Sequence, residues 1–229
     1  MKPRMPRRLV LSAVIGLLAV AGLAGCRIEQ GAAVFVGDTR ISDSEVNEVV
    51  DSIPVELITS DLSTVSKAYG GIRNQVLEAL TVVELGHQVA ADTGRQIDAD
   101  ALANAREGWM QRTGLDADNA LVSLMAEAEG YRAMLREGAV PEAPTPADVE
   151  DAAANVAAVT GQPLNDAELG QLEADLSSPQ GQELIGQNRQ ISGYVAEYGV
   201  TPNPKYGQFA IVTFLNARGI PLLTVPVSS

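Results

Sequence analysis

Apolar positions recur at helical spacing through the middle of the chain, and the pattern is strongest over residues 71–93. Five apolar side chains share one face of this segment: Ile72, Val76, Ala79, Leu80 and Val83. The opposite face carries polar side chains at the same spacing: Asn74, Glu78, Thr81, Gln88 and Asp92. We therefore expect an amphipathic helix that exposes its polar face and ends at Gly94.

Further helices are predicted on both sides of this segment. Ser42 and Glu45 have the spacing of a capping box, so a helix should begin there and end near Pro54. Five more ranges are helical in pattern and are bounded by Gly, Pro, Asn or Asp: 99–111, 118–136, 146–159, 166–176 and 180–198. A proline-containing acidic linker at 138–146 separates two of them.

Strand patterns occur only near the two ends of this helical region. Residues 33–36 and 39–41 flank a tight turn at Gly37-Asp38, and residues 207–215 and 220–225 flank a turn at 216–219. A two-stranded piece is seldom stable alone in water, so the two hairpins are predicted to pair in one small antiparallel sheet that closes the domain. The predicted fold is mostly α, with a helical domain over residues 33–229.

The N-terminus has the pattern of a signal peptide over residues 1–25. Four basic side chains and no acidic one precede an apolar run at residues 9–21, which is shorter than the roughly 20 residues needed to span a bilayer. Leu23-Ala24-Gly25-Cys26 resembles the lipobox of bacterial lipoproteins. Cleavage is therefore predicted between Gly25 and Cys26, with a lipid on Cys26, the only cysteine. The alternative is an ordinary secretory signal followed by an incidental cysteine.

These signals predict a lipid-anchored protein on the extracytoplasmic face of the cell membrane, with residues 26–32 as a lipidated linker. Removal of residues 1–25 takes away four basic side chains, so the formal charge changes from −13 to −17. Nucleic-acid phosphates and anionic headgroups repel such a surface. We therefore expect no nucleic-acid partner, and contact with the membrane only through the lipid.

Two stretches of the chain suggest a family. Residues 34–46, Val-Phe-Val-Gly-Asp-Thr-Arg-Ile-Ser-Asp-Ser-Glu-Val, resemble the opening of the SurA N-terminal chaperone domain, in which a short hairpin leads into a capped helix. Residues 74–80, continuing to Ile97-Asp98, resemble the long helix that follows in that domain. The run Asn203-Pro204-Lys205-Tyr206-Gly207 resembles the ending of actinobacterial lipoproteins that carry it.

The resemblance implies an extracytoplasmic chaperone-like protein that holds extended segments of unfolded secreted proteins in an apolar groove. Many relatives also carry a parvulin-type prolyl isomerase domain. This chain has no segment similar to that domain between residues 100 and 200 and no second histidine, so isomerase activity is not expected.

Candidate chemistry is sparse elsewhere. The chain has no HExxH, Walker, GxGxxG or GxSxG motif and no second Cys or His for a zinc site, so we expect no enzymatic activity, cofactor or metal. The acidic pairs Glu127/Glu129 and Glu150/Asp151 lack the spacing of a calcium loop. His87 is expected on the apolar face of its helix, either as a buried acid–base group or pH sensor, or as a partly buried side chain hydrogen-bonded to a neighbour.

Five methionine and aromatic side chains are the candidates for client binding: Trp109, Met110, Met125, Tyr131 and Met134. Methionine is common on promiscuous binding surfaces because its side chain is flexible and polarizable. The alternative is that all five fill the core of a chain in which only 4% of residues are aromatic. For function, the alternative to a chaperone is an assembly lipoprotein that docks one specific envelope partner, and a third is an enzyme without a recognisable signature.

Overall fold

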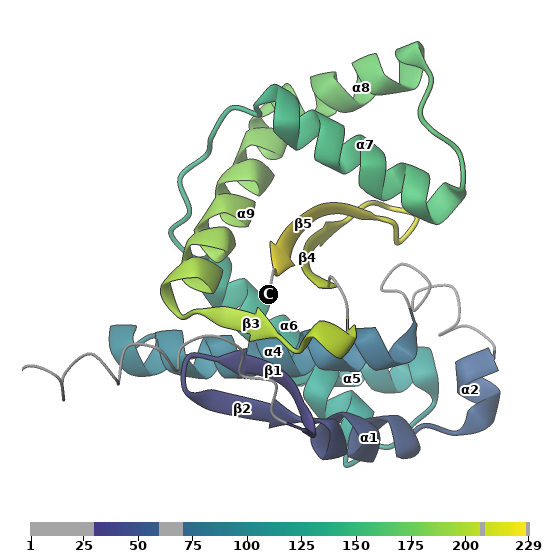
Figure 1. Ribbon diagram of the computed structural model, residues 1–229, viewed down its shortest axis with the longest axis vertical. Helices are drawn as coiled ribbons and strands as arrows, with labels where there is room; N and C mark the ends of the chain where they lie inside the picture. The colour runs from purple at the N-terminus through teal and green to yellow at the C-terminus, as the bar shows by residue number, and fades with distance from the viewer. Residues whose placement is uncertain (1–29, 60–70, 207–208, 228–229) are drawn as a thin grey trace, which may run out of the picture. The chain divides into compact units, whose positions relative to one another are not determined.

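The computed structural model describes residues 30–59, 71–206 and 209–227, and helices dominate this part of the chain (Figure 1). The helices are α1 (Asp43–Asp51), α2 (Val55–Thr59), α4 (Ile72–Thr93), α5 (Ala99–Thr113), α6 (Ala120–Arg136), α7 (Pro146–Thr160), α8 (Asp166–Ser177) and α9 (Pro179–Glu197). The strands are β1 (Ala32–Val36), β2 (Thr39–Ser42), β3 (Val200–Pro202), β4 (Phe209–Leu215) and β5 (Pro221–Val227). The predicted signal peptide, its cleavage site and Cys26 lie outside the described residues.

The predicted helix boundaries are confirmed to within a few residues, because local capping sets them. Ser42 caps α1 by accepting a hydrogen bond from the Glu45 N–H at 3.2 Å, and Glu45 accepts one from the Ser42 N–H at 2.6 Å. Gly94 ends α4 in the left-handed conformation, with φ of 73°. The mostly α prediction is correct for the described residues.

The predicted single sheet is wrong, because the two hairpins do not pair with each other. β1 pairs antiparallel with β2 on one edge and with β3 on the other, giving the order β2-β1-β3, whereas β4 and β5 form a separate two-stranded sheet. β3 was not predicted. It follows α9 through Gly199, which has φ of 62°, and occupies the edge of β1 that the C-terminal hairpin was expected to cover.

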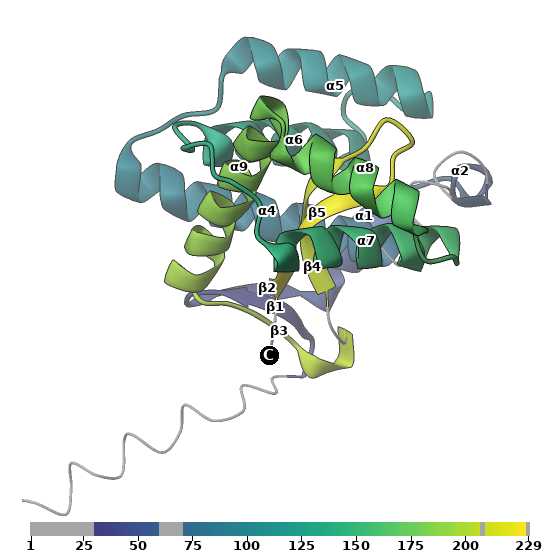
Figure 2. The ribbon, with the colours of Figure 1, turned by 90° about the horizontal axis from the view of Figure 1, so that it is seen from above.

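Helix α4 is the centre of the main hydrophobic core. It packs against α6, α1, β1 and β4, so its buried arc is wider than an amphipathic pattern predicts. α6 in turn lies between α4 and α5 (Figure 2). As a result, Glu78 and Thr81 are buried, and the prediction that they lie on an exposed face is wrong. The buried hydroxyl of Thr81 donates a hydrogen bond to the carbonyl of Leu77, one turn earlier in the same helix, at 2.8 Å.

A smaller core links the C-terminal hairpin to the last three helices. It contains Ala152, Leu172, Leu176, Ile185 and Leu223. Helices α7 and α9 pack against β5 of the hairpin, and α4 packs against β4 (Figure 1). β4 therefore belongs to both cores, and its edge facing α4 and α6 is where the polar groups described below gather.

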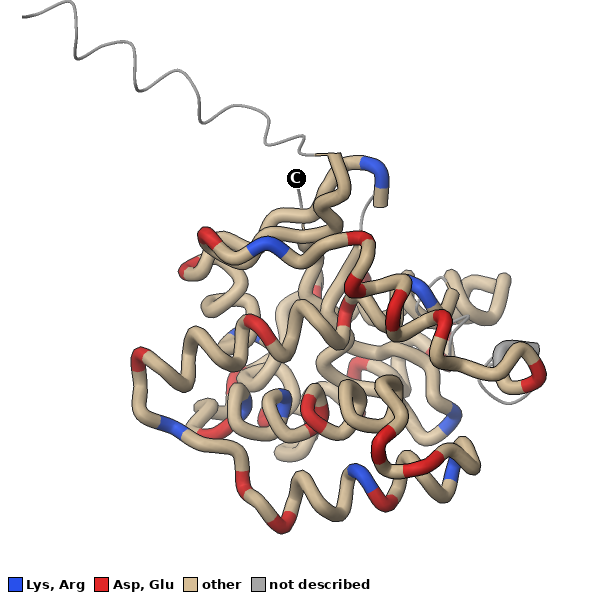
Figure 3. Tube along the Cα trace, turned by 90° about the horizontal axis from the view of Figure 1, so that it is seen from below, with Lys and Arg blue, Asp and Glu red and all other residues tan. Residues whose placement is uncertain are grey.

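Acidic residues are spread over the helices, and basic residues are fewer (Figure 3). Among the described residues, no helix combines the length and the apolar character needed to cross a membrane.

Candidate functional site

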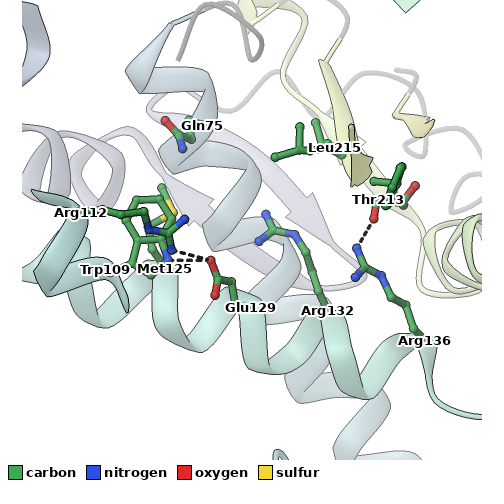
Figure 4. Close-up of a pocket in the computed structure, with 11 residues that line it drawn as sticks. Gln75, Trp109, Arg112, Met125, Glu129, Arg132, Arg136, Thr213 and Leu215 are labelled. Carbon is green, nitrogen blue, oxygen red and sulfur yellow. Dashed lines mark hydrogen bonds and ion pairs between the residues drawn. The ribbon is translucent and has the colours of Figure 1, made fainter. Parts of the chain in front are cut away.

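A cavity of about 400 Å³ opens between α4, α5, α6 and β4 (Figure 4). Its walls combine apolar and charged groups from all four elements: Gln75, Trp109, Arg112, Met125, Glu129, Arg132, Arg136, Val212, Thr213, Phe214 and Leu215. A few oriented polar groups on a partly apolar wall are typical of a ligand site, and sites of this kind span roughly 300–1,000 Å³. We therefore take this cavity as the candidate functional site.

Helix α6 supplies one complete wall through its periodicity. Met125, Glu129, Arg132 and Arg136 are spaced by four, three and four residues, so they share one helical face. This face is turned into the cavity, where Arg136 reaches β4 and Glu129 reaches α5 (Figure 4). The spacing thus places one carboxylate between an apolar end and a basic end of the same wall.

Glu129 holds the α5 side of the cavity in place. Its Oε1 accepts a hydrogen bond from the indole Nε1 of Trp109 at 2.8 Å and one from Nη2 of Arg112 at 3.3 Å. The Arg112 guanidinium lies 4.1 Å above the Trp109 ring centroid, a cation–π arrangement, and its Nε donates to the Gly108 carbonyl at 3.2 Å. Three interactions therefore fix the direction of Arg112, although its side chain remains 58% exposed at the rim.

A buried ion pair lies behind the opposite wall. Glu78, which is 1% exposed, is paired with Arg132, and its second oxygen accepts a hydrogen bond from the Val212 N–H at 3.2 Å. Burial raises the pKa of Glu78, and the charge and hydrogen bond of Arg132 oppose that shift. Arg136 donates to the carbonyl of Thr213. In the described sheet β4 pairs with β5 alone, so the backbone groups on its other edge are open to the side chains of α4 and α6.

Gln75 is the polar residue of α4 on this cavity wall (Figure 4). It is only 3% exposed, and its side-chain oxygen accepts no hydrogen bond from the described part of the protein. A buried amide oxygen without a donor costs about 1–3 kcal/mol. A ligand that brought a donor to this position would recover that cost.

The five predicted client-binding residues do not form one surface. Trp109 and Met125 are buried in the core and also line the cavity. Tyr131 and Met134 are buried in the core away from the lining, and Met110 is partly buried against it. The alternative that these side chains fill the core thus describes Tyr131 and Met134, whereas Trp109 and Met125 serve both the core and the cavity.

His87 lies outside the cavity and is half exposed, so its predicted place on the apolar face is wrong. Its Nε2 is 3.3 Å from Oε1 of Glu127, and its ring and the Tyr131 ring form a T-shaped pair with centroids 4.9 Å apart. The expectation of a hydrogen-bonded neighbour is correct. Among residues 30–59, 71–206 and 209–227, no three His, Cys, Asp or Glu side chains gather in a way that could hold a metal ion.

The basic and amide residues of the cavity were missed at the level of sequence. Arg112, Arg132 and Arg136 are not among the predicted site residues, although their presence on two neighbouring helices of an acidic chain is a usable signal. Gln75 carried no such signal, because its burial depends on β4, which is more than 130 residues away.

Comparison of the chain with known protein families, with curated proteins and with solved structures gives no match. The resemblance to the SurA N-terminal domain therefore stays a prediction that rests on the stretches quoted above.

Proposed function

We propose that this chain is a non-catalytic binding protein of the cell envelope that docks a segment of a partner polypeptide in the cavity between α4, α5, α6 and β4. The observation that carries the proposal is the cavity itself, in which apolar side chains and oriented hydrogen-bonding groups meet at a strand edge. Polypeptide segments offer the same combination of apolar side chains and backbone donors and acceptors.

Docking of a defined segment is favoured over general holding of unfolded chains. A general chaperone of the kind implied by the SurA resemblance needs a broad apolar groove. In the described part of the chain, the exposed large apolar side chains are Val55, Val140, Val159 and Leu169, and they belong to four different segments. Scattered single residues of this kind are ordinary on soluble proteins and do not make a groove.

The location is part of the same proposal. The pattern of residues 1–26 supports export and lipid attachment at Cys26, and the acidic mature chain supports a membrane contact made by the lipid alone. A lipid anchor would keep the cavity near the membrane, where envelope polypeptides emerge and assemble.

Chemical cross-linking of intact cells tests the proposal with two matched variants. Leu215→Glu places a charge in the apolar wall of the cavity, and Leu169→Glu makes the same change on an exposed position of α8. We expect one discrete polypeptide partner to be captured by the wild type and by Leu169→Glu, and to be lost with Leu215→Glu. Identical capture by all three proteins would contradict docking in the cavity.

An aggregation assay separates the two functions. If the protein in stoichiometric excess delays the aggregation of several unrelated unfolded proteins, the general chaperone role implied by the resemblance becomes the better account. Docking of a defined segment predicts no delay for most of them.

A further inference from the structure

The charge on the cavity walls is opposite in sign to that of the chain. The protein carries a formal charge of −13, and only twelve of its Lys and Arg side chains follow Cys26. Three of these twelve, Arg112, Arg132 and Arg136, line one cavity. Among the described residues that line or adjoin the cavity, the carboxylates are Glu129 in the wall and Glu78 behind it, so this lining carries more positive than negative side chains.

The positive charge of these arginines attracts a ligand while their hydrogen bonds and ion pairs within the protein stay in place. Arg132 and Arg136 hold Glu78 and the Thr213 carbonyl, and their charge extends into the cavity through space. Arg112 is held at the rim by Trp109 and Glu129 with its direction already fixed. A preoriented guanidinium is the protein group best matched to a carboxylate, which it can bind through two parallel hydrogen bonds.

Gln75 specifies a second feature of the ligand. Its buried amide oxygen needs a hydrogen-bond donor, and a carboxylate by itself offers none. The ligand should therefore carry an N–H as well as a carboxylate. The C-terminal residue of a polypeptide has this arrangement, because its backbone N–H lies one carbon from the terminal carboxyl group.

The remaining wall is apolar. Met125, Phe214 and Leu215 line it beside the Trp109 ring. A volume of about 400 Å³ is at the lower end of the range for ligand sites and suits one or two residues rather than a long segment. An apolar side chain next to the carboxylate would fill this part of the cavity.

We propose that the cavity binds the free C-terminus of a partner polypeptide whose last side chain is apolar, with Arg112, supported by the charge of Arg132 and Arg136, receiving the carboxylate and Gln75 accepting a backbone N–H. This inference rests on the proposed docking function and names the part of the partner that docks.

Fluorescence titration tests the inference with the processed full chain, because Trp109 is the only tryptophan and lies in the cavity wall. The probes are three N-acetylated pentapeptides that end in leucine, valine or phenylalanine with a free carboxyl group. Each is compared with its C-terminal carboxamide, and with a carboxamide that carries glutamate next to the last position. We expect at least one free acid to bind and its carboxamide to bind at least about tenfold more weakly, since a hydrogen bond to a charged group contributes about 1.5–3 kcal/mol.

Matched variants assign the effect to the cavity. Arg112→Gln should remove the preference for the free acid, whereas Arg106→Gln, the same change on the exposed side of α5, should leave it unchanged. Gln75→Leu should weaken the acid and the carboxamide by the same factor, because it removes the acceptor for an N–H that both peptides carry.

Equal binding of acid and carboxamide would overturn the inference and leave docking of a segment standing. Equal binding of the free acid and the glutamate carboxamide would also overturn it, in favour of an internal acidic segment. Absence of binding by all three free acids would overturn it as well. The proposed docking function fails separately, if cross-linked partners do not depend on the cavity.

Discussion

The N–H of Val212 donates a hydrogen bond to the buried carboxylate of Glu78 at 3.2 Å and so ties the C-terminal hairpin to the central helix. The other oxygen of this carboxylate is paired with Arg132, whose side chain is only 13% exposed. One side chain of α4 thereby satisfies a backbone group of β4 and a buried charge of α6. The wall of the cavity depends on this arrangement.

Glu78→Ala should therefore be among the most destabilising single changes on α4. It leaves the Arg132 charge without its buried counter-ion, which typically costs 3–5 kcal/mol. Glu78→Gln keeps an acceptor for Val212 and should cost less. Urea unfolding followed by circular dichroism measures both, with the exposed Glu150→Gln on α7 as the control. A free energy of unfolding for Glu78→Ala within about 0.5 kcal/mol of the wild type would contradict the role assigned to the pair.

The central helix also shows what the sequence could and could not predict. The range of α4 follows from periodicity and from Gly94, because both act over neighbouring residues. The burial of Glu78 and Gln75 depends on β4, which arrives from the far end of the chain, and no local pattern reports it. An amphipathic pattern predicts one buried helix face, whereas other elements pack against several faces of α4.

In the sheets and the cavity, too, features formed by neighbouring residues could be predicted, and features formed by distant segments could not. The hairpins predicted at residues 33–41 and 207–225 could be recognised because each is formed by neighbouring residues. β3 has only three residues, too few for its alternation to be recognised as a strand, so its pairing with β1 could not be predicted. The cavity collects residues from four elements, and among its lining residues only Trp109 and Met125 are predicted client-binding residues, by residue type rather than by position.

At Gly186 of α9, close packing leaves no room for a side chain. A Cβ at this position would overlap the carbonyl oxygen of Val140, which is backbone and cannot move without shifting the linker before α7. Gly186→Ala should cost about 1–3 kcal/mol, the usual range for overpacking. Gly193 lies on the same helix with open space around it, so Gly193→Ala should instead stabilise by up to about 1 kcal/mol. Thermal melts that move in the same direction for both variants would refute this account.

The protein should lose stability in acid through Asp43. Burial alone would raise the pKa of Asp43, but hydrogen bonds from Lys205 and Tyr206, with the charges of Lys205 and Arg73, outweigh it and lower the pKa below the ordinary value of 3.8. A carboxylate with a lowered pKa stabilises the folded state above the unfolded-state pKa, and this contribution disappears as the pH falls through the folded-state value. The free energy of unfolding should therefore decrease as the pH falls below about 3.8.

Asp43→Asn checks the origin of that acid dependence. The variant should be less stable than the wild type at pH 6 and should lose less stability between pH 4 and pH 2. Asp151→Asn, on the exposed side of α7, removes the same charge and should keep the slope of the wild type. If the two variants have the same slope, Asp43 does not cause the dependence.

The lipid anchor predicts a clear change in location. Cys26 is the only cysteine of the chain, so Cys26→Ala removes the only thiol available for lipid attachment. We expect the variant to remain unprocessed or to be released into the medium. Retention of a processed variant in carbonate-washed membranes at the wild-type level would count against lipidation.

Site-specific photo-cross-linking tests the central claim, that the cavity docks a polypeptide segment. A photoreactive amino acid is placed at Leu215 in the cavity wall and, in a second variant, at the exposed Leu169 of α8, and each protein is irradiated in intact cells. We predict one discrete polypeptide adduct from position 215, identified by mass spectrometry, and none from position 169. The absence of an adduct at position 215, or the same adducts from both positions, would contradict the claim.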